Sequence, residues 1–144
     1  MPSFDTDLTG SMPLHEEGQI DFTTRDARIQ LAKMLMRLFE HWQLPTAAQA
    51  SLLGLGPSSR AALGRYKTGK ALANAPDLLE RAGNLLAIHK SLRTLFPHDR
   101  ELAYSWVNCP NRAFHDKTPL EIMVEYRFAG LLKIRAYLEQ AASK

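Results

Sequence analysis

The heptapeptide GRYKTGK, residues 64–70, contains the residue types of a phosphate-binding loop. Gly64, Gly69 and Lys70 reproduce most of the glycine-rich loop that cradles nucleotide phosphates. That loop also requires a strand before it and a Ser or Thr after the lysine to hold magnesium. In this chain Ala71 follows the lysine, and the stretch RAAL before Gly64 belongs to a predicted helix whose C-terminal half disfavours an anion. The spacing therefore does not predict a nucleotide-binding loop.

Catalytic and metal-binding patterns are also missing from the sequence. The five histidines show no HExxH spacing, and a single cysteine, Cys109, cannot build a zinc site. The carboxylates stand beside Lys or Arg on predicted helix surfaces, as ordinary solvated charges do. We therefore expect no enzymatic activity, no metal and no cofactor.

Charge is distributed unevenly along the chain. Residues 1–20 contain four acidic and no basic residues, whereas residues 45–75 contain four basic and no acidic residues. A purely basic segment of this kind predicts a surface that faces an anion such as DNA, with a solvated basic face as the alternative.

The remaining composition fits a protein of the cytoplasm. No run of about 18 apolar residues is present that could span a membrane. The first residues lack the basic start and the apolar stretch of a secretion signal. A lone cysteine fits a reducing compartment. We expect a cytoplasmic protein with no membrane contact, in which residues 1–20 form a flexible acidic tail.

The first predicted helix begins near Thr23, with Asp26 three residues later in a pattern typical of a capping box. Apolar residues then recur at helical spacing up to Trp42. The apolar stripe is wider than one small core needs, so this helix buries two faces, either both within one core or one of them against a second copy of the chain. The residues that widen it are Leu31, Met34 and Leu38.

Two short helices follow, joined by a glycine-containing turn. Thr46 is expected to cap the first, which ends at Gly54, and the second begins at Ser58 or Ser59 and closes near Gly69. Such a pair with a basic second helix is typical of a helix-turn-helix, and the letters A-x-x-L-G that end at Gly54 match its turn. The residues expected to contact DNA are Ser58, Ser59, Arg60, Arg65, Lys67 and Lys70.

Pro76 begins a long fourth helix that reaches about Phe96, and Pro97 marks the expected boundary between two subdomains. Beyond it come a helix near residues 100–107, an irregular stretch and a helical pair split near Gly130. No segment alternates apolar and polar residues as a strand would, so the expected fold class is all-α. The expected units are the tail at 1–20, a helix-turn-helix bundle at 21–96 and a small helical subdomain at 97–144.

The stretch WVNCPNRAFHDKTPLEIM, followed after a short interval by a glycine and LLKIRAYL, is the most specific part of the sequence. Thr118, Pro119 and Glu121 within it predict a helix start. Trp106 and Phe114 are large enough to pin the irregular stretch against the last two helices. The pattern resembles the toxin-binding domain of the Xre/MbcA/ParS antitoxin family. The matching residues are Trp106, Pro110, Asn111, Phe114, Pro119, Leu120, Gly130 and Leu138.

The resemblance implies an antitoxin of a toxin–antitoxin pair. Its partner would be a RES-domain toxin that degrades NAD⁺, and it would repress its own operon by binding operator DNA, as a homodimer within a larger complex. Because the interval from Gly54 to Gly69 is longer than in the usual Xre motif, a protein-interaction and dimerisation module without DNA binding is the alternative. The expected toxin-binding residues are Trp106, Asn111, Phe114, Leu120, Lys133, Arg135 and Lys144, the last three as donors that could reach a phosphate pocket.

Overall fold

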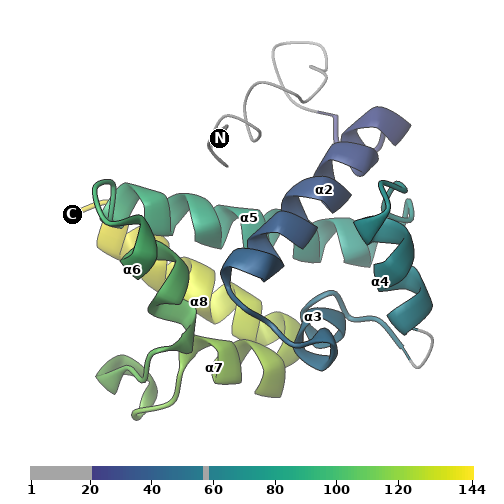
Figure 1. The fold of residues 1–144 in the computed structure, drawn as a ribbon. Coiled ribbons are helices and arrows are strands. Elements are labelled where there is room, and N and C mark those ends of the chain that lie inside the picture. Colours follow the sequence, from purple (N-terminus) through teal and green to yellow (C-terminus); the bar gives the residue numbers. More distant parts are fainter. Residues whose placement is uncertain (1–20, 57–58) are drawn as a thin grey trace.

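The computed structural model describes residues 21–56 and 59–144, and its regular elements there are all helices (Figure 1). This confirms the expected all-α class, and the only β-pairing within the described residues is an isolated bridge between Asn111 and Lys117. The tail expected at residues 1–20 and the contact expected at Ser58 lie outside the described residues. In chain order the helices are α2 (Arg25–His41), α3 (Thr46–Leu52), α4 (Ser59–Lys67), α5 (Pro76–Leu95), α6 (Arg100–Ser105), the 3₁₀ turns η2 (Trp106–Asn108) and η3 (Arg112–Phe114), α7 (Pro119–Glu125) and α8 (Arg127–Ala142).

Helix α2 begins one residue later than the capping pattern predicts. Thr24, rather than Thr23, is the N-cap, and its hydroxyl accepts a hydrogen bond from the Ala27 amide at 3.1 Å. Thr23 instead donates to the side chain of Asp21 in the preceding turn. The register of the helix is nevertheless as expected, because the apolar stripe decides which residues face inward.

The wide apolar stripe of α2 is buried within one chain. Leu31, Met34 and Leu38 are all covered by the protein's own residues. The hypothesis that these residues form a dimer contact is therefore wrong, because α4 and α5 pack against α2 and its apolar residues belong to the common core. The side chains that α2 leaves fully exposed are charged: Arg25, Asp26, Lys33 and Glu40.

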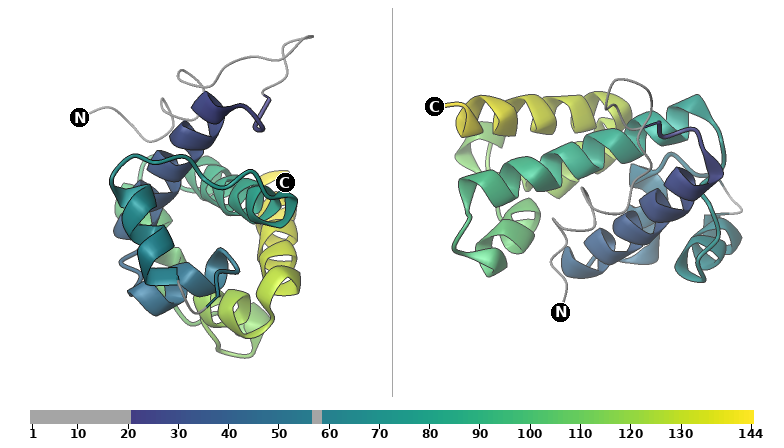
Figure 2. Two further views of the ribbon diagram at one scale, coloured as in Figure 1. Left: turned by 90° about the vertical axis from the view of Figure 1, so that its right-hand side faces the viewer. Right: turned by 90° about the horizontal axis from the view of Figure 1, so that it is seen from above.

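Helices α5 and α8 form the centre of the molecule. They run side by side in the same direction, with α2 crossing α5 on the other side (Figures 1 and 2). Leu85 and Leu92 of α5, and Leu131, Ile134 and Leu138 of α8, are buried in one continuous hydrophobic core. Because α3 also packs against α7 and α8, the two halves of the chain share this core.

The last two helices are separated at Tyr126, not near Gly130 as the sequence suggested. Gly130 lies inside α8, at the point where this helix crosses α7. A Cβ atom at Gly130 would lie 2.3 Å from the carbonyl oxygen of Ile122 and 2.9 Å from the Cα of Met123. The glycine is needed because the backbones approach too closely for any side chain.

The start of α7 follows the sequence prediction. The Thr118 hydroxyl accepts from the Glu121 amide at 3.0 Å, and the Glu121 carboxylate accepts from the Thr118 amide at 2.9 Å, which completes a capping box. Pro119 occupies the first helical position, where its missing N–H costs no hydrogen bond.

Within the described residues, no helix has both the length and the hydropathy needed to cross a membrane.

Candidate functional site

The basic side chains of the predicted DNA-contacting segment all lie on the surface. Arg60, Arg65 and Lys67 project from α4, and Lys70 follows in the loop. The inward side of α4 consists of Leu63 and Tyr66, both buried. Tyr66 is therefore a core aromatic residue and not a backbone contact for DNA. Ser59, the first residue of α4, is half-buried.

The part of the turn between α3 and α4 that the structure describes fits a helix-turn-helix. Ala50 and Leu53 are buried where the two helices cross, and Gly54 has a φ of +66°, a conformation that L residues rarely adopt. A Cβ atom at Gly54 would also lie 2.7 Å from Nε of Arg81, a residue of α5. Thr46 is the first residue of α3, but Pro45 holds the N-cap position and no side chain caps this helix, contrary to the prediction.

The end of the basic segment is fastened to α2. The Arg28 guanidinium donates to the Leu72 carbonyl at 2.7 Å, and the Leu72 amide donates to the Arg28 carbonyl at 3.2 Å. These bonds hold the loop after Lys70 against the first turns of α2. The C-terminal end of the basic surface is thus fixed to the body of the protein.

The second candidate surface centres on an aromatic cluster of Trp106, Phe114 and Tyr137. Trp106 meets Phe114 edge to face with ring centroids 6.5 Å apart, and both rings contact Tyr137 of α8, at 6.1 and 5.0 Å. Trp106 and Phe114 therefore pin the irregular stretch as predicted, and they pin it against α8. Tyr137 was not among the residues expected to bind toxin, although its helical spacing from Lys133 places both residues on one side of α8.

Asn111 shapes the loop that carries Phe114. Its side-chain oxygen accepts from the Ala113 amide at 2.9 Å and caps η3, while its backbone amide donates to the Lys117 carbonyl at 3.1 Å. His115 and Asp116 complete the loop in the left-handed conformation. Asn111 thus has a structural role, because it caps η3 and closes the loop.

Three large apolar side chains, one after α7 and two on α8, are exposed. Tyr126 is 51 % exposed, Leu132 46 % and Tyr137 38 %. Lys133 is exposed and its Nζ lies 6.0 Å from the centre of the Phe114 ring. Leu120 is half-buried and Lys144 is exposed at the last position. Exposed aromatic and aliphatic side chains with a cation nearby are typical of a protein-binding surface.

Arg135 differs from the other two basic residues predicted for toxin binding. Its Nη1 donates to the side-chain oxygen of Asn84 in α5 at 2.9 Å, and its Nε donates to Glu139 at 3.2 Å. Asn84 is buried, and its own amide nitrogen donates to the Glu80 carbonyl. Arg135 therefore connects α8 to α5 in the free protein, whereas Lys133 and Lys144 have no such attachment within the described residues.

An ion pair lies beside the exposed ring of Tyr126. Nζ of Lys117 lies 2.7 Å from the Glu125 carboxylate, and this hydrogen bond, with the charge of Glu125, raises the pKa of Lys117. The pKa of Glu121 is lowered, first by the hydrogen bond from the Thr118 amide and then by the one with the Thr118 hydroxyl. Both pairs are exposed, so they orient the loop and add little to stability.

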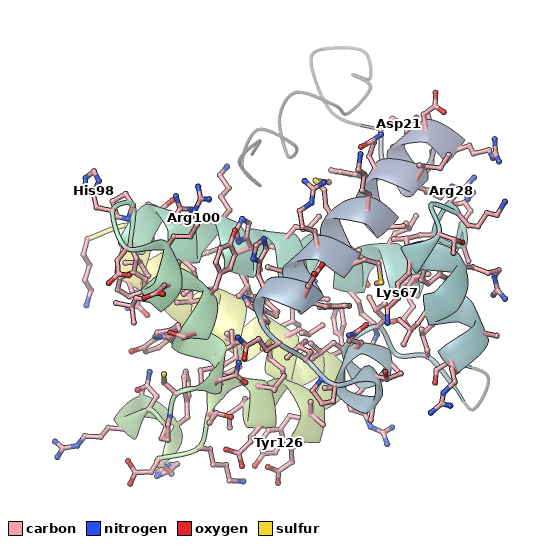
Figure 3. All side chains as sticks on the ribbon, in the orientation of Figure 1. Asp21, Arg28, Lys67, His98, Arg100 and Tyr126 are labelled. Carbon is pink, nitrogen blue, oxygen red and sulfur yellow. The ribbon has the colours of Figure 1, made fainter. Side chains whose placement is uncertain are left out.

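The two candidate surfaces lie apart. Figure 3 shows Lys67 on the α4 side of the molecule and Tyr126 at the edge formed by α7 and α8. One chain can therefore present the basic surface to one partner and the aromatic surface to another. Within residues 21–56 and 59–144, no group of three or more His, Cys, Asp or Glu side chains could hold a metal ion.

A helix-turn-helix and a second, aromatic-rich helical unit built on one core define the class of the protein. Two family descriptions match it: the antitoxin Xre-like helix-turn-helix domain at residues 31–87, and the antitoxin Xre/MbcA/ParS C-terminal toxin-binding domain at residues 91–144. The matched segments meet inside α5, and the domain boundary at residue 97 stays a prediction.

The similarity to one relative includes parts of both helical units. The uncharacterized protein y4oB of Sinorhizobium fredii (strain NBRC 101917 / NGR234) is 33 % identical over 104 residues, which are 72 % of this chain and 77 % of that protein. The chain belongs to the Xre-type antitoxins, a family of non-enzymatic regulatory proteins. It is an antitoxin of a toxin–antitoxin pair, with a toxin as its partner.

Proposed function

We propose that this antitoxin binds a RES-domain toxin, closes the toxin's NAD⁺ pocket with its C-terminal region, and represses its own operon by binding DNA through α4. The observation that carries the proposal is the pairing of two separate exposed surfaces, one basic and one apolar, on a helix-turn-helix and a toxin-binding unit. Repression would place the protein in the cytoplasm. The RES partner itself is supported by the resemblance of the C-terminal sequence pattern.

The end of α8 has the features needed to block the phosphate-binding pocket of a toxin. Leu131, Ile134 and Leu138 fix the helix to the core, so its last turn is presented on a rigid base. Lys133 and Lys144 are exposed and supply the cations. Arg135 could join them only by leaving Asn84 or Glu139, so we assign it a weaker part than its charge alone suggests.

The toxin half is tested by deleting residues 139–144. None of these residues is fully buried, so we expect the shortened chain to keep its melting temperature within a few degrees while it protects NAD⁺ less well from a RES-domain toxin. The variant Lys144→Ala separates the loss of one charge from the loss of the last turn. If the shortened chain inhibits the toxin as fully as the intact one, the blocking element lies elsewhere, and the loop Asn111–Lys117 is the next candidate.

The gene beside that of this protein offers a direct check of the partner. A RES-domain reading frame is expected there, because toxin and antitoxin are encoded as a pair. An adjacent toxin gene of another class would overturn the RES assignment and leave the antitoxin assignment intact.

The DNA half is tested by the double variant Arg65→Ala and Lys67→Ala. Since phosphate contacts release counterions, we expect weaker binding to every duplex and a fall of about two in the slope of log affinity against log salt concentration. Lys90→Ala with Arg112→Ala removes the same charge from other surfaces and serves as the control. Unchanged binding in the first variant would favour an interaction module without DNA binding.

A homodimer within the toxin–antitoxin complex is part of the proposal, because operators commonly have two-fold symmetry. The contact must avoid Leu31, Met34 and Leu38, which are buried in the chain. Light scattering of the free protein should give twice 16.2 kDa if the dimer forms without toxin or DNA.

A further inference from the structure

A cavity of about 500 Å³ lies behind the helix-turn-helix, where α3, the start of α4, α5 and the start of α8 meet. Its polar lining consists of Ser51, Ser59, Arg81 and Arg127, and Gly54 and Leu55 of the turn form part of its wall. This volume falls within the range of about 300–1,000 Å³ that is typical of ligand pockets. The lining of the cavity includes none of the exposed apolar side chains of the C-terminal helices and none of the outward basic side chains of α4.

The charges of the cavity favour an anion. Two arginines and two hydroxyls line it, and no carboxylate of the described residues is part of the lining. Asp77 binds Nε of Arg81 at 3.1 Å, but its own side chain is 67 % exposed and engages only one of the five N–H donors of that guanidinium. Ser59 is the first residue of α4, whose N-terminal amides add a partial positive charge.

The protein holds the Arg81 head in place from several sides. Nε of Arg81 packs against Gly54, 2.7 Å from where a Cβ atom at Gly54 would stand, and Cζ lies 5.6 Å from the centre of the Phe128 ring. Together with Asp77 these contacts fix the guanidinium between the turn and α8. A fixed guanidinium binds two phosphate oxygens at a smaller entropic cost than a mobile one.

Arg127, the second arginine of the cavity, has an unusual backbone conformation and an unusual place in its helix. Its φ is +56°, a left-handed conformation that strains a residue with a Cβ atom, and it stands at the beginning of α8, where a positive charge opposes the helix dipole. No ion pair or hydrogen bond of its side chain occurs within the described residues. Arg127 thus lines the cavity as an exposed residue whose charge has no compensating group within the described residues.

We propose that the cavity lined by Arg81, Arg127, Ser51 and Ser59 is a phosphate-binding site. Two arginine forks and two hydroxyl donors match the oxygens of a phosphate group. The group belongs either to the DNA backbone or to a free phosphorylated small molecule, and the chemistry of recognition is the same. The site joins the helix-turn-helix to the toxin-binding unit, because Arg127 lies in the latter. It does not require α4 itself to bind DNA.

The variant Arg127→Gly tests the proposal without endangering the fold. Glycine adopts a positive φ freely, so the substitution removes the guanidinium and relaxes the backbone at the same time. Arg112→Ala is the control, because it removes one exposed charge from the distant η3 turn. Arg127→Lys keeps the charge and loses the two-pronged donor, so it should behave as an intermediate.

The first measurement is the melting temperature of the full chain in inorganic phosphate, with chloride adjusted to constant ionic strength. At ten times the dissociation constant, wild type and Arg112→Ala should rise by roughly 3–6 °C, and Arg127→Gly should lose this rise. The second measurement is affinity for a duplex of unrelated sequence at several salt concentrations. If the natural phosphate is that of DNA, Arg127→Gly should weaken binding and lower the salt slope by about one.

The outcomes distinguish the two possible sources of the phosphate group. A lost phosphate response with wild-type duplex binding points to a free phosphorylated ligand, whereas loss of both points to the DNA backbone. The proposal is overturned if Arg127→Gly responds to phosphate as wild type does and binds the duplex as Arg112→Ala does. If the wild-type chain binds no duplex at all, the DNA half of the proposed function fails, and the phosphate titration still decides this site.

Discussion

The helix-turn-helix pair, α3 and α4, and the C-terminal pair, α7 and α8, are held by different means. The first pair consists of short helices with no side-chain cap on α3, a turn at Gly54 and an outward face made of basic groups. The second pair has a complete capping box at Thr118, a backbone crossing at Gly130 and an aromatic cluster beside it. Local geometry therefore constrains the C-terminal pair more tightly than the helix-turn-helix pair.

This difference in construction corresponds to a difference in what the two kinds of binding surface require. A surface that binds DNA phosphates works through long cationic side chains, and the positions of their helices need to be right only within the reach of those side chains. A surface that docks a protein partner must present a fixed shape. The tighter construction of the C-terminal pair agrees with its place in the toxin-binding domain.

Two glycine-to-alanine variants give the largest contrast between the regions. At Gly130 the added methyl would meet the Ile122 carbonyl, so α7 and α8 must separate, and we expect a loss of about 3 kcal/mol of unfolding free energy. At Gly64, in the middle of α4, nothing lies within 4 Å of the added methyl, so alanine should stabilise by about 0.5–1 kcal/mol. Urea denaturation measures both.

The contrast would be broken if both variants changed stability in the same direction. Gly83→Ala provides a further control, because Gly83 lies within α5 with open space around it and should behave like Gly64. A stability change at Gly130 as favourable as the one at Gly83 would mean that the crossing of α7 and α8 adjusts easily.

The sequence predicted those parts that depend on local signals. The capping box at Thr118, the helix start at Pro76 and the turn at Gly54 were all readable, because each uses a residue type whose preference is set by its own backbone. The break near Gly130 was misplaced, because a glycine that ends a helix and a glycine that allows two helices to cross look alike in sequence.

Contacts between distant segments could not be predicted. The sequence gives no sign that Arg81 packs against Gly54 or that Arg135 binds Asn84, because these pairs depend on how α5 and α8 are placed. The burial of Leu31, Met34 and Leu38 within one chain has the same origin. An apolar stripe shows that a face is buried, but not which element covers it.

The helix starts give a smaller contrast than the glycines. Thr118→Ala removes a hydroxyl that accepts from the Glu121 amide, so we expect a loss of about 1 kcal/mol in unfolding free energy. Thr46→Ala should change it by less than about 0.5 kcal/mol, because Thr46 is exposed and caps nothing. If both substitutions cost the same by urea denaturation, α3 has a cap that forms in solution, and the two regions are more alike than the structure indicates.

The smallest expected effect concerns the junction of α2 and α6. There His41, at the end of α2, stacks on Tyr104 of α6 with ring centroids 4.2 Å apart. Burial lowers the pKa of His41 from its usual 6.5, and Arg100 and Arg37 lower it further, while Glu40 opposes them. The folded protein thus binds fewer protons than the unfolded chain just below pH 6.5. Stability is therefore lost as the pH falls through this window and is retained above it.

Two variants test this sign through the melting temperature between pH 7.5 and pH 5. His41→Gln removes the titrating group, so the fall in melting temperature on acidification should become shallower than in the wild type. Glu40→Gln removes the charge that holds the pKa of His41 up, so the fall should become steeper. Should all three proteins lose stability in parallel, protonation of His41 does not strain the junction, and the contact between α2 and α6 tolerates the imidazolium.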